Sequence, residues 1–510
     1  MTDVLAPPAP SPAVRENAVV TLESVRAVST SRSIGLGIAV VLLALIELLK
    51  FALGTSGSLE STIQFADVPA NAVPSLSTLM QVVVGVIGAC AIAGGVVLIV
   101  RRRLRSLGVL AAVIGTILVA WPVALAANLN GPGDMLKSLT LPVTGTAWVI
   151  GLVSLAGGLA LIATRSARAA YPIFFVAMAL FIFAFLVWIA RSSNVNSYEQ
   201  LTLTALLATT FISATPLMFG SLSGVVCERA GVVNIAIEGQ FMLGALGSEM
   251  ITSYIGPTTF GFVAGTLVAA ALGAILGAIL AYMALRFRAN QIIVGVVIVA
   301  ICTALVQFVI DQVLNNSQWL NTGYQPQPIA IRGLSEIPVL GPVLFDQKFF
   351  VYLAFILVAL VNVILFRTRW GLRIRSVGEK PKASETVGLN VARIRFITVV
   401  LGGAIAGIGG ATFTIGLGSP MIVGITGGQG FIALAIMIFG RWRPWGAFMA
   451  TLLFGFSIAL GSQYGLYTSQ FGVPNQLITA LPYLITIAAV AGLVGRVRPP
   501  AADGIPYSRE

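Results

Sequence analysis

Long, uninterrupted runs of apolar residues set the pattern of this chain. A helix needs about 20 apolar residues to cross about 30 Å of hydrocarbon. The runs are continuous rather than alternating, so they do not indicate the strands of a membrane barrel, whereas helices satisfy their own backbone hydrogen bonds in lipid. We therefore predict an all-α polytopic membrane protein with about 14 transmembrane helices. The predicted spans lie near 34–53, 76–100, 106–127, 143–164, 169–190, 201–226, 231–254, 259–285, 290–313, 349–366, 396–417, 425–440, 444–461 and 476–495.

Two of these spans carry signs of irregular backbone. The run at 231–254 contains Asn234, Glu238 and Glu249, and we expect its start to be partly unwound. The run at 425–440 is short and has glycines near its start, so we expect a broken or re-entrant helix there. Irregular backbone at membrane depth is tolerated where it lines a cavity, so both runs are candidates for a transport path.

The distribution of basic residues predicts the orientation. Cytoplasmic loops of membrane proteins carry an excess of Lys and Arg. With a cytoplasmic N-terminus and alternating spans, the C-terminus is also cytoplasmic, and most of the 30 Lys and Arg residues fall inside. Those that fall outside are Lys50, Lys137, Arg191, Arg332 and Lys348. The net charge of +12 is therefore a topology signal, and we do not expect nucleic-acid binding.

Composition agrees with a lipid environment and limits the chemistry. Hydrophobic residues make up 57% of the chain and charged residues 9%, against about 25% charged residues in soluble domains. The chain has no histidine, which excludes Ser-His-Asp catalysis and His-ligated zinc. Cys90, Cys227 and Cys302 are far apart in the sequence, so neither a metal site nor a disulfide is indicated. We expect no enzyme activity.

Four regions follow one another along the chain. Residues 1–33 are rich in Pro, Ala and Ser at their start and predict a disordered cytoplasmic tail. Residues 34–168 predict four spans, and residues 169–495 carry nearly all of the unusual polar residues. Residues 496–510 predict a second cytoplasmic tail.

The first informative stretch is CERAGVVNIAIEGQ, residues 227–240. Asn234 and Glu238 are four apart, so we expect them to share a helical face. A carboxylate at the bilayer centre costs about 2.5–3.5 kcal/mol, so it should face a cavity, a partner or the interface. Two interpretations stay open, a polar lining or gate of a translocation path and a structural hydrogen-bond knot between helices. Glu228 and Arg229 lie at the cytoplasmic end of a span, which favours an interfacial anchor.

The second stretch is the basic loop at 367–395. Gly378, Pro381 and Gly388 punctuate it, and the residues between them can form one or two helical turns. One interpretation is a positive-inside loop that fixes orientation. The other is a docking element that transmits force from a cytoplasmic motor.

The third stretch is GGQGFIALAIMIFGRWRPWG, residues 427–446. Its glycines permit an unwound helix start at membrane depth, which suits substrate contact. The alternative is a glycine loop followed by an aromatic and basic interfacial belt. That belt would contain Arg441, Trp442, Arg443 and Trp445.

No phosphate-binding loop with a Gly-Lys pair occurs in the chain, so it does not hydrolyse ATP by itself. An ATP-driven process would need its motor in a separate subunit. We expect no cofactor bound by this chain.

Together the three stretches resemble the branched-chain amino acid/ribose-type family of ABC importer permeases, and within it the nucleoside/simple-sugar branch. ERAGVVNIAIEG, residues 228–239, is similar to the signature of that branch. RANQIIVG, residues 288–295, and the other two stretches follow in the family's order. The resemblance covers residues 201–495.

The resemblance implies that 169–495 is a permease core that moves nucleosides or related simple sugars inward, in a bacterial plasma (inner) membrane. It implies a cytoplasmic ABC ATPase subunit that binds the ATP, a second homologous permease subunit and an extracellular substrate-binding lipoprotein. The segment 376–390 would be the coupling helix that seats in the ATPase. The signature residues are Glu228, Arg229, Asn234, Glu238 and Gly239, and the residues on the coupling pattern are Gly378, Glu379, Pro381, Ala383 and Gly388.

The chain departs from this pattern at its start. The four spans at 34–168 are additional to those of the family, and no function follows for them from the sequence. Gln240 stands where the branch commonly has methionine. The alternative function is an ion-coupled secondary transporter of a small polar solute, which needs a coupling carboxylate in the membrane. The candidates are Glu47, Glu238, Glu249 and Asp311.

Overall fold

Two compact units divide the chain, Met1–Leu203 and Thr204–Glu510. The computed structural model describes residues 34–52, 60–64, 138–164, 173, 180, 203–324, 326–335, 341–464 and 498–507. The predicted spans at 76–100, 106–127, 169–190 and 476–495 lie wholly or almost wholly outside these residues, as does the predicted tail at 1–33. The four-region division of the chain stays a prediction.

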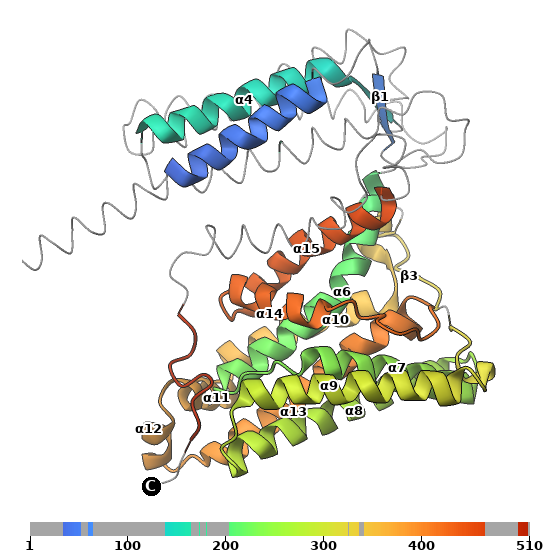
Figure 1. Ribbon diagram of the computed structural model, residues 1–510, viewed down its shortest axis with the longest axis vertical. Coiled ribbons are helices and arrows are strands. Elements are labelled where there is room, and N and C mark those ends of the chain that lie inside the picture. Colours follow the sequence, from blue (N-terminus) through green and yellow to red (C-terminus); the bar gives the residue numbers. More distant parts are fainter. Residues whose placement is uncertain are drawn as a thin grey trace, which may run out of the picture. The chain divides into compact units, whose positions relative to one another are not determined.

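In the first unit two apolar helices lie side by side (Figure 1). One covers Ile34–Leu49, and its end joins a π-helical turn, η1 (Glu47–Ala52). The other is α4 (Val143–Thr164), which coincides with a predicted span. The two helices approach closely through glycine, since a Cβ at Gly151 would lie 2.7 Å from the Leu48 side chain.

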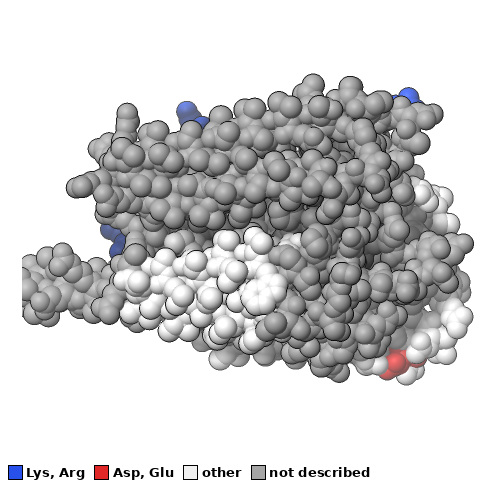
Figure 2. Space-filling model, turned by 90° about the horizontal axis from the view of Figure 1, so that it is seen from above, with Lys and Arg blue, Asp and Glu red and all other residues white. Residues whose placement is uncertain are grey.

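A short antiparallel sheet stands before α4, in which β1 (Glu60–Gln64) pairs with β2 (Ser138–Pro142) and Glu60 lies opposite Pro142. Figure 2 shows the molecule turned by 90° about the horizontal axis of Figure 1, so that it is seen from above. On that face the described residues in view include one patch that carries no Lys, Arg, Asp or Glu, and a few charged atoms are visible away from it. An uncharged surface of apolar helices is what a lipid environment requires.

The second unit is a helical bundle in which the same apolar runs reappear as helices. Six helices of the described residues are long and apolar enough to cross a membrane. The chain is therefore a polytopic helical membrane protein, as predicted, while the full number of spans stays a prediction. The helices of this unit are α6 (Leu203–Arg229), α7 (Ile237–Ile255), α8 (Thr259–Arg286), α9 (Gln291–Val309), α10 (Phe349–Arg367), α11 (Arg369–Glu379), α12 (Pro381–Thr386), α13 (Val391–Ala411), α14 (Gln429–Phe439) and α15 (Pro444–Tyr464).

Short π and 3₁₀ turns extend or connect these helices. Two of them, η2 (Ile310–Leu314) and η5 (Thr412–Gly416), prolong α9 and α13. The loop between α9 and α10 holds η3 (Gln318–Leu320), η4 (Gly341–Phe345) and a two-residue antiparallel pairing of β3 (Ile329–Ala330) with β4 (Asp346–Gln347).

Glycine positions bring α7, α8 and α13 close together. A Cβ at Gly273 of α8 would lie 2.2 Å from the carbonyl oxygen of Gly403 in α13. A Cβ at Gly244 of α7 would lie 2.3 Å from the carbonyl oxygen of Gly407. Small residues let helices pack backbone to backbone, which is the main source of close helix association in lipid.

Both runs with expected irregular backbone are irregular. The segment between α6 and α7 is a turn, three residues of irregular backbone and a second turn, and α7 begins only at Ile237. The expectation that Asn234 and Glu238 share a helical face is wrong, because Asn234 precedes the helix. The helix α14 has 11 residues, a length of about 16 Å, which is half of a membrane crossing. It follows a turn in which Gly427 and Gly428 have left-handed φ values of 54° and 76°.

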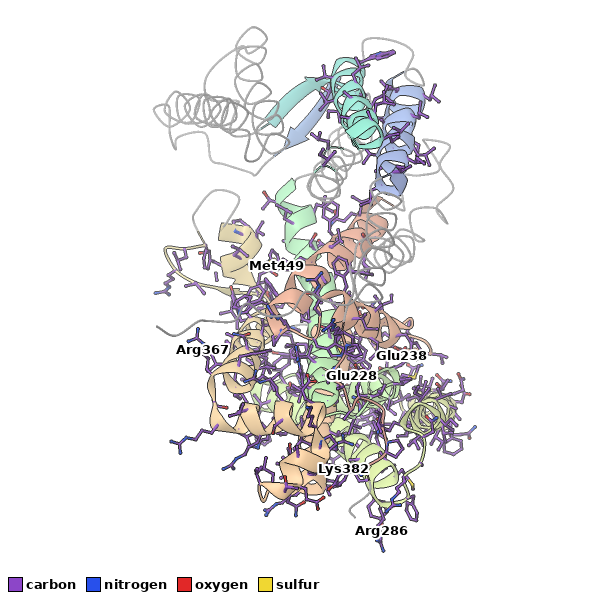
Figure 3. All side chains as sticks on the ribbon, turned by 90° about the vertical axis from the view of Figure 1, so that its left-hand side faces the viewer. Glu228, Glu238, Arg286, Arg367, Lys382 and Met449 are labelled. Carbon is purple, nitrogen blue, oxygen red and sulfur yellow. The ribbon has the colours of Figure 1, made fainter. Side chains whose placement is uncertain are left out.

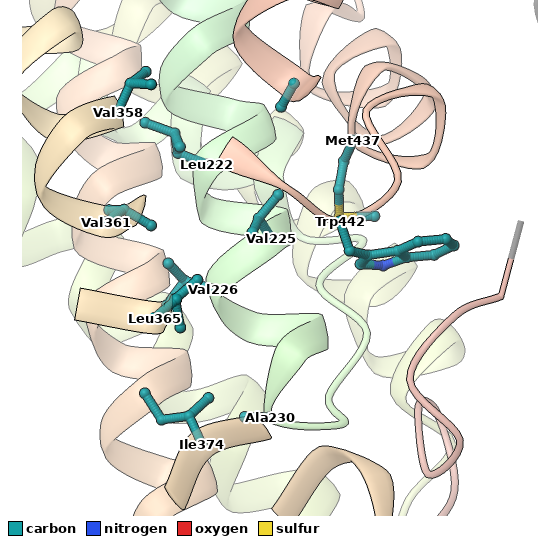
Figure 4. Close-up of a cluster of buried hydrophobic side chains, with 11 residues drawn as sticks. Leu222, Val225, Val226, Ala230, Val358, Val361, Leu365, Ile374, Met437 and Trp442 are labelled. Atoms are coloured by element: carbon teal, nitrogen blue, oxygen red, sulfur yellow. The ribbon is translucent and has the colours of Figure 1, made fainter. Parts of the chain in front are cut away.

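A hydrophobic cluster at one end of the bundle packs segments of α6, α10, α11, α14 and α15 together (Figure 4). Its members come from the second halves of α6 and α10, the middle of α11, the end of α14, the turn that follows α14 and the start of α15. These apolar contacts fix the α11 helix against the signature stretch, since a buried cluster moves as a unit. The buried members are Leu222, Val225, Val226, Ala230, Val358, Val361, Leu365, Ile374, Met437, Trp442 and Ala447.

Candidate translocation and coupling site

The signature stretch leaves α6 through a tight turn and rises back into the bundle. Gly231 has a φ of 85°, a conformation that glycine adopts at no steric cost. The backbone then continues without regular secondary structure past Asn234, and a turn at 235–236 leads into α7. Glu228 and Glu238, at the two ends of this connection between α6 and α7, both lie inside the bundle (Figure 3).

Glu228 and Arg229 form hydrogen bonds with the turn after α14. The Trp442 indole Nε1–H donates to Glu228 Oε2 at 2.6 Å, and Arg229 Nε donates to the Trp442 carbonyl oxygen at 2.9 Å. Arg441 and Trp442 have φ values of 58° and 53°, which are uncommon for residues with a side chain. The two signature residues therefore stabilise a strained turn between α14 and α15.

Asn234 forms a buried polar knot with the end of α6. Its Nδ2 donates to Ser223 Oγ at 3.2 Å and to Gln240 Oε1 at 3.1 Å. Both amide side chains have no exposed surface. Asn234 Oδ1 and Gln240 Nε2 find no hydrogen-bond partner among the described residues. These two hydrogen bonds hold the irregular segment 232–234 against α6 and α7.

Glu238 holds the start of α14. Its Oε1 accepts from Thr426 Oγ1 at 2.6 Å and from the Gly428 N–H at 3.0 Å, and its Oε2 accepts from the Gly430 N–H at 2.6 Å. The side chain is 2% exposed. Charge-assisted hydrogen bonds are stronger than neutral ones, and a carboxylate is favoured at a helix N-terminus. The carboxylate therefore fastens the half-membrane helix α14 to α7.

Two further residues position this stretch against α9. A Cβ at Gly239 would lie 3.2 Å from Cys302 Sγ, so the close approach of α7 and α9 needs a small residue there. Gln291 Oε1, at the start of α9, accepts from the Val233 N–H at 2.7 Å. The sequence analysis did not single out Gln291, although it is a polar residue in the first turn of a long apolar run.

The residues of the predicted coupling pattern lie on two short helices, α11 and α12, and just after them, at the end of the bundle where the C-terminus lies (Figure 1). A Cβ at Gly378 would lie 2.2 Å from the carbonyl oxygen of Arg229, so the α11 helix touches the signature turn directly. Pro381 occupies the first turn of α12, where its missing N–H costs nothing. The sequence indicated the turns of α12 but not the separate helix α11.

The outer side of α12 is open. Ala383 is exposed, and Val387, just past the end of the helix, is 75% exposed. Gly388 follows with a φ of 85° and ends the helix. An apolar side chain exposed outside the membrane is a feature of protein contact surfaces.

Residues 498–507 return to the same end of the bundle, and the sequence did not single them out. Asp503 lies against Glu228 and Arg395. Burial raises the pKa of Asp503 from its ordinary value of 3.8 to about 6. Arg395 is fully buried at the start of α13. An arginine inside the start of an apolar run was the signal that could have drawn attention to it.

The predicted site residues thus fall into two linked groups. Glu228, Arg229 and Glu238 contact the turns at the two ends of α14, and Gly378 contacts Arg229. Ala383 and Gly388 lie apart from them on the exposed side of α12. Within the described ranges, no group of three or more metal-binding side chains occurs.

Comparison with known proteins identifies relatives over the second unit. The family model described as branched-chain amino acid transport system / permease component matches residues 206–490. The guanosine ABC transporter permease protein NupQ of Bacillus subtilis is 37% identical over 312 residues, covering 60% of this chain and 97% of NupQ. The nucleoside ABC transporter permease protein NupC of Lactococcus lactis is 36% identical over 310 residues, covering 60% of this chain and 97% of NupC.

A third relative is the putative glucose ABC transporter permease protein TsgC13 of Haloferax volcanii, which is 33% identical over 313 residues, 57% of this chain and 92% of its own length. No solved structure matches the chain. The family match covers more than half of the 510 residues, and the relatives are matched over nearly their whole length. The chain therefore belongs to the family of permease components of branched-chain amino acid transport systems, as a membrane-spanning transport subunit rather than an enzyme.

Proposed function

We propose that this chain is the permease subunit of an ABC importer that moves nucleosides, or related simple sugars, inward by alternating access. The observation that carries the proposal is the contact of Gly378 with the carbonyl oxygen of Arg229. No side chain fits between the α11 helix and the signature turn, so a displacement of α11 is passed directly to the end of α6.

A second contact continues this route into the membrane. Arg229 donates to the Trp442 carbonyl oxygen at the end of α14, and Glu238 binds the backbone at its start. A short helix held at both ends by the signature stretch moves when that stretch moves. Broken helices of this kind line substrate sites in other transporters, and α14 together with α7 and α9 would line the path here.

The exposed side of α12 supports docking of a cytoplasmic ABC ATPase subunit. The knob formed by α12, Val387 and Gly388 offers an apolar tip on a short rigid helix. ATP would bind to that partner, and we expect this chain to bind no cofactor of its own.

Other partners follow from the family. Bacillus subtilis has two guanosine ABC transporter permease proteins, NupQ and NupP, and both match this chain. We infer that a second homologous permease subunit completes the pathway and that an extracellular lipoprotein delivers the substrate. The full assembly would lie in a bacterial plasma membrane, with about 14 spans in this chain and both of its termini in the cytoplasm.

The substrate class rests on the relatives. NupQ and NupC are named for guanosine and nucleosides, and TsgC13 for glucose. A nucleoside and a simple sugar share a ring with several hydroxyl groups, so one polar path can suit either class. The ion-coupled alternative is disfavoured by the family assignment, and Glu238, one of its candidate carboxylates, is fully engaged by three donors.

The test is uptake by intact cells with and without the gene. Labelled guanosine, uridine, ribose and glucose would be supplied separately at low concentration. We expect loss of uptake of nucleosides in the deletion strain and its return on complementation. Uptake of nucleosides that is unchanged, with loss of ribose or glucose uptake, would assign the sugar class, and unchanged uptake of all four would remove the substrate proposal.

A further inference from the structure

The C-terminal segment 498–507 crosses the site between the coupling helices and the signature turn. The Ala502 N–H donates to the Gly378 carbonyl oxygen at 2.9 Å, and the Ala501 N–H donates to Glu379 Oε2 at 3.2 Å. Two consecutive residues are therefore bonded to the end of α11, at the positions of the coupling pattern.

Arg395 fixes the same segment to α13. Its guanidinium donates to the Ala502 carbonyl oxygen at 3.4 Å and to the Ile505 carbonyl oxygen at 3.2 Å. The Arg395 side chain has no exposed surface and is the largest of the fully buried side chains among the described residues. A buried arginine is costly unless it is paired, so these carbonyl oxygens and the nearby Asp503 provide its environment.

The segment also reaches the signature turn. A Cβ at Gly231 would lie 2.6 Å from Arg395 Nη2 and 2.9 Å from the Ala502 carbonyl oxygen. Gly504 lies against Val233, at 3.4 Å from a Cβ built on the glycine to Val233 Cγ2. The absence of a side chain at Gly231 leaves room for the segment.

The end of the segment contacts α12. The Tyr507 hydroxyl donates to Glu385 Oε2, and the Arg395 guanidinium lies 5.9 Å from the centre of the Tyr507 ring. One segment of ten residues thus contacts the signature turn, α11, α12 and α13 (Figure 1).

We propose that residues 498–507 form a splint that holds the α11 and α12 helices at a fixed position on the signature turn, with Arg395 as the positioning residue that seats it. This inference rests on the proposed function, because it concerns how force from an ATPase reaches the pathway. A helix of six residues such as α12 has little stability of its own. Without the splint, movement of the ATPase would displace α12 alone, and the signature turn would not follow.

The test compares uptake with ATP hydrolysis in membrane vesicles that contain the complete transporter. One variant lacks residues 499–510, and its matched control lacks only residues 508–510, beyond Tyr507. We expect the longer truncation to reduce substrate moved per ATP hydrolysed by about tenfold, the scale of a coupling free energy between two sites. The control truncation should match the full chain. Arg395→Leu should behave like the longer truncation, and Arg395→Lys should restore part of the coupling.

A cross-link gives a second, independent readout. Glu385→Cys and Tyr507→Cys would be joined by a short bis-maleimide in a Cys90→Ser background. A splint that stays in place predicts that the cross-linked protein keeps most of its uptake. Loss of uptake on cross-linking, a truncation with unchanged uptake per ATP, or a truncation with raised uptake would each overturn the splint.

If the truncation lowers the amount of protein in the membrane, the cross-linked full-length protein still tests whether the splint stays in place during uptake. Failure of the proposed function gives a different result, since the full chain would then show no ATP-dependent uptake at all.

Discussion

Glu238 on α7 accepts a hydrogen bond from the backbone N–H of Gly430, 192 residues further along the chain, at 2.6 Å. Two more donors, Thr426 Oγ1 and the Gly428 N–H, reach its other oxygen. All donors to this carboxylate come from the turn that starts α14. Glu238 therefore fastens α7 to α14, and both of its carboxylate oxygens already accept hydrogen bonds within the protein.

This arrangement predicts that Glu238→Gln lowers the maximal rate of uptake and leaves the apparent KM almost unchanged. The amide keeps one acceptor but places an N–H group against one of the donors, so α14 loses its position. We expect a loss of about tenfold, equal to about 1.4 kcal/mol and close to the lower limit of about 1.5 kcal/mol for hydrogen bonds to charged groups. Thr426→Val, which removes one donor only, should give a smaller loss in the same direction. A rise in KM at an unchanged maximal rate would instead make Glu238 a substrate ligand.

A methyl group at position 378 should break the contact between α11 and the signature turn. In Gly378→Ala the new Cβ would lie 2.2 Å from the Arg229 carbonyl oxygen, so backbone must shift. We expect ATP hydrolysis to continue while substrate moved per ATP falls by about tenfold. Ser376→Ala, two residues earlier on the same helix, is the matched control and should transport normally. Normal transport by Gly378→Ala would show that α11 does not transmit force at this point.

The hydrogen bond from Trp442 to Glu228 should contribute to stability. Trp442→Phe keeps an aromatic ring in the hydrophobic cluster but leaves Glu228 Oε2 without its donor. An unsatisfied buried acceptor costs about 1–3 kcal/mol, so the melting temperature of the purified protein in detergent should fall by several degrees. Trp445→Phe is the control, because Trp445 is 50% exposed. Equal melting temperatures for the two variants would contradict the importance of this bond.

The docking of residues 498–507 should depend on pH through Asp503. Burial raises its pKa from 3.8 to about 6, so the docked segment binds a proton more tightly than the free segment. The stabilisation of docking by the protonated Asp503 carboxyl group is fully present below pH 3.8 and is lost as the pH rises through about 6. The groups facing Asp503 are Glu228 from α6 and Arg395 from α13.

Hydrogen exchange at the Ala502 amide, corrected for the intrinsic pH dependence, measures this docking. We expect protection to fall between pH 5 and pH 7 in the wild-type protein, around the pKa of about 6. Asp503→Asn should stay protected over that range, because the amide has no charge to gain. A wild-type profile as flat as that of the variant would show that Asp503 does not control the segment.

The sequence predicted apolar helices within the described residues, because an apolar run of about 20 residues is the length that crosses a bilayer as a helix. The run at 259–285 became α8 at Thr259–Arg286, within one residue. The unwound entry to α7 was also predictable, since Asn234 and Glu238 interrupt the apolar pattern. Their exact environment was not, because the donors to Glu238 come from residues almost 200 positions away.

The site was predicted in part for the same reason. Glycine at 378 could be recognised as a helix boundary or hinge, but its contact with Arg229 depends on tertiary packing. The segment 498–507 is rich in Pro and Ala, a composition that is typical of a tail. Its docking is visible only in the structure, since it depends on a buried arginine at position 395.

ATP-dependent uptake of labelled guanosine into right-side-out vesicles, loaded with or without ATP and containing the complete transporter, tests the central claim most directly. The account predicts uptake that requires internal ATP and survives ionophores that collapse ion gradients. Uptake that proceeds without ATP and disappears with an ionophore would contradict it.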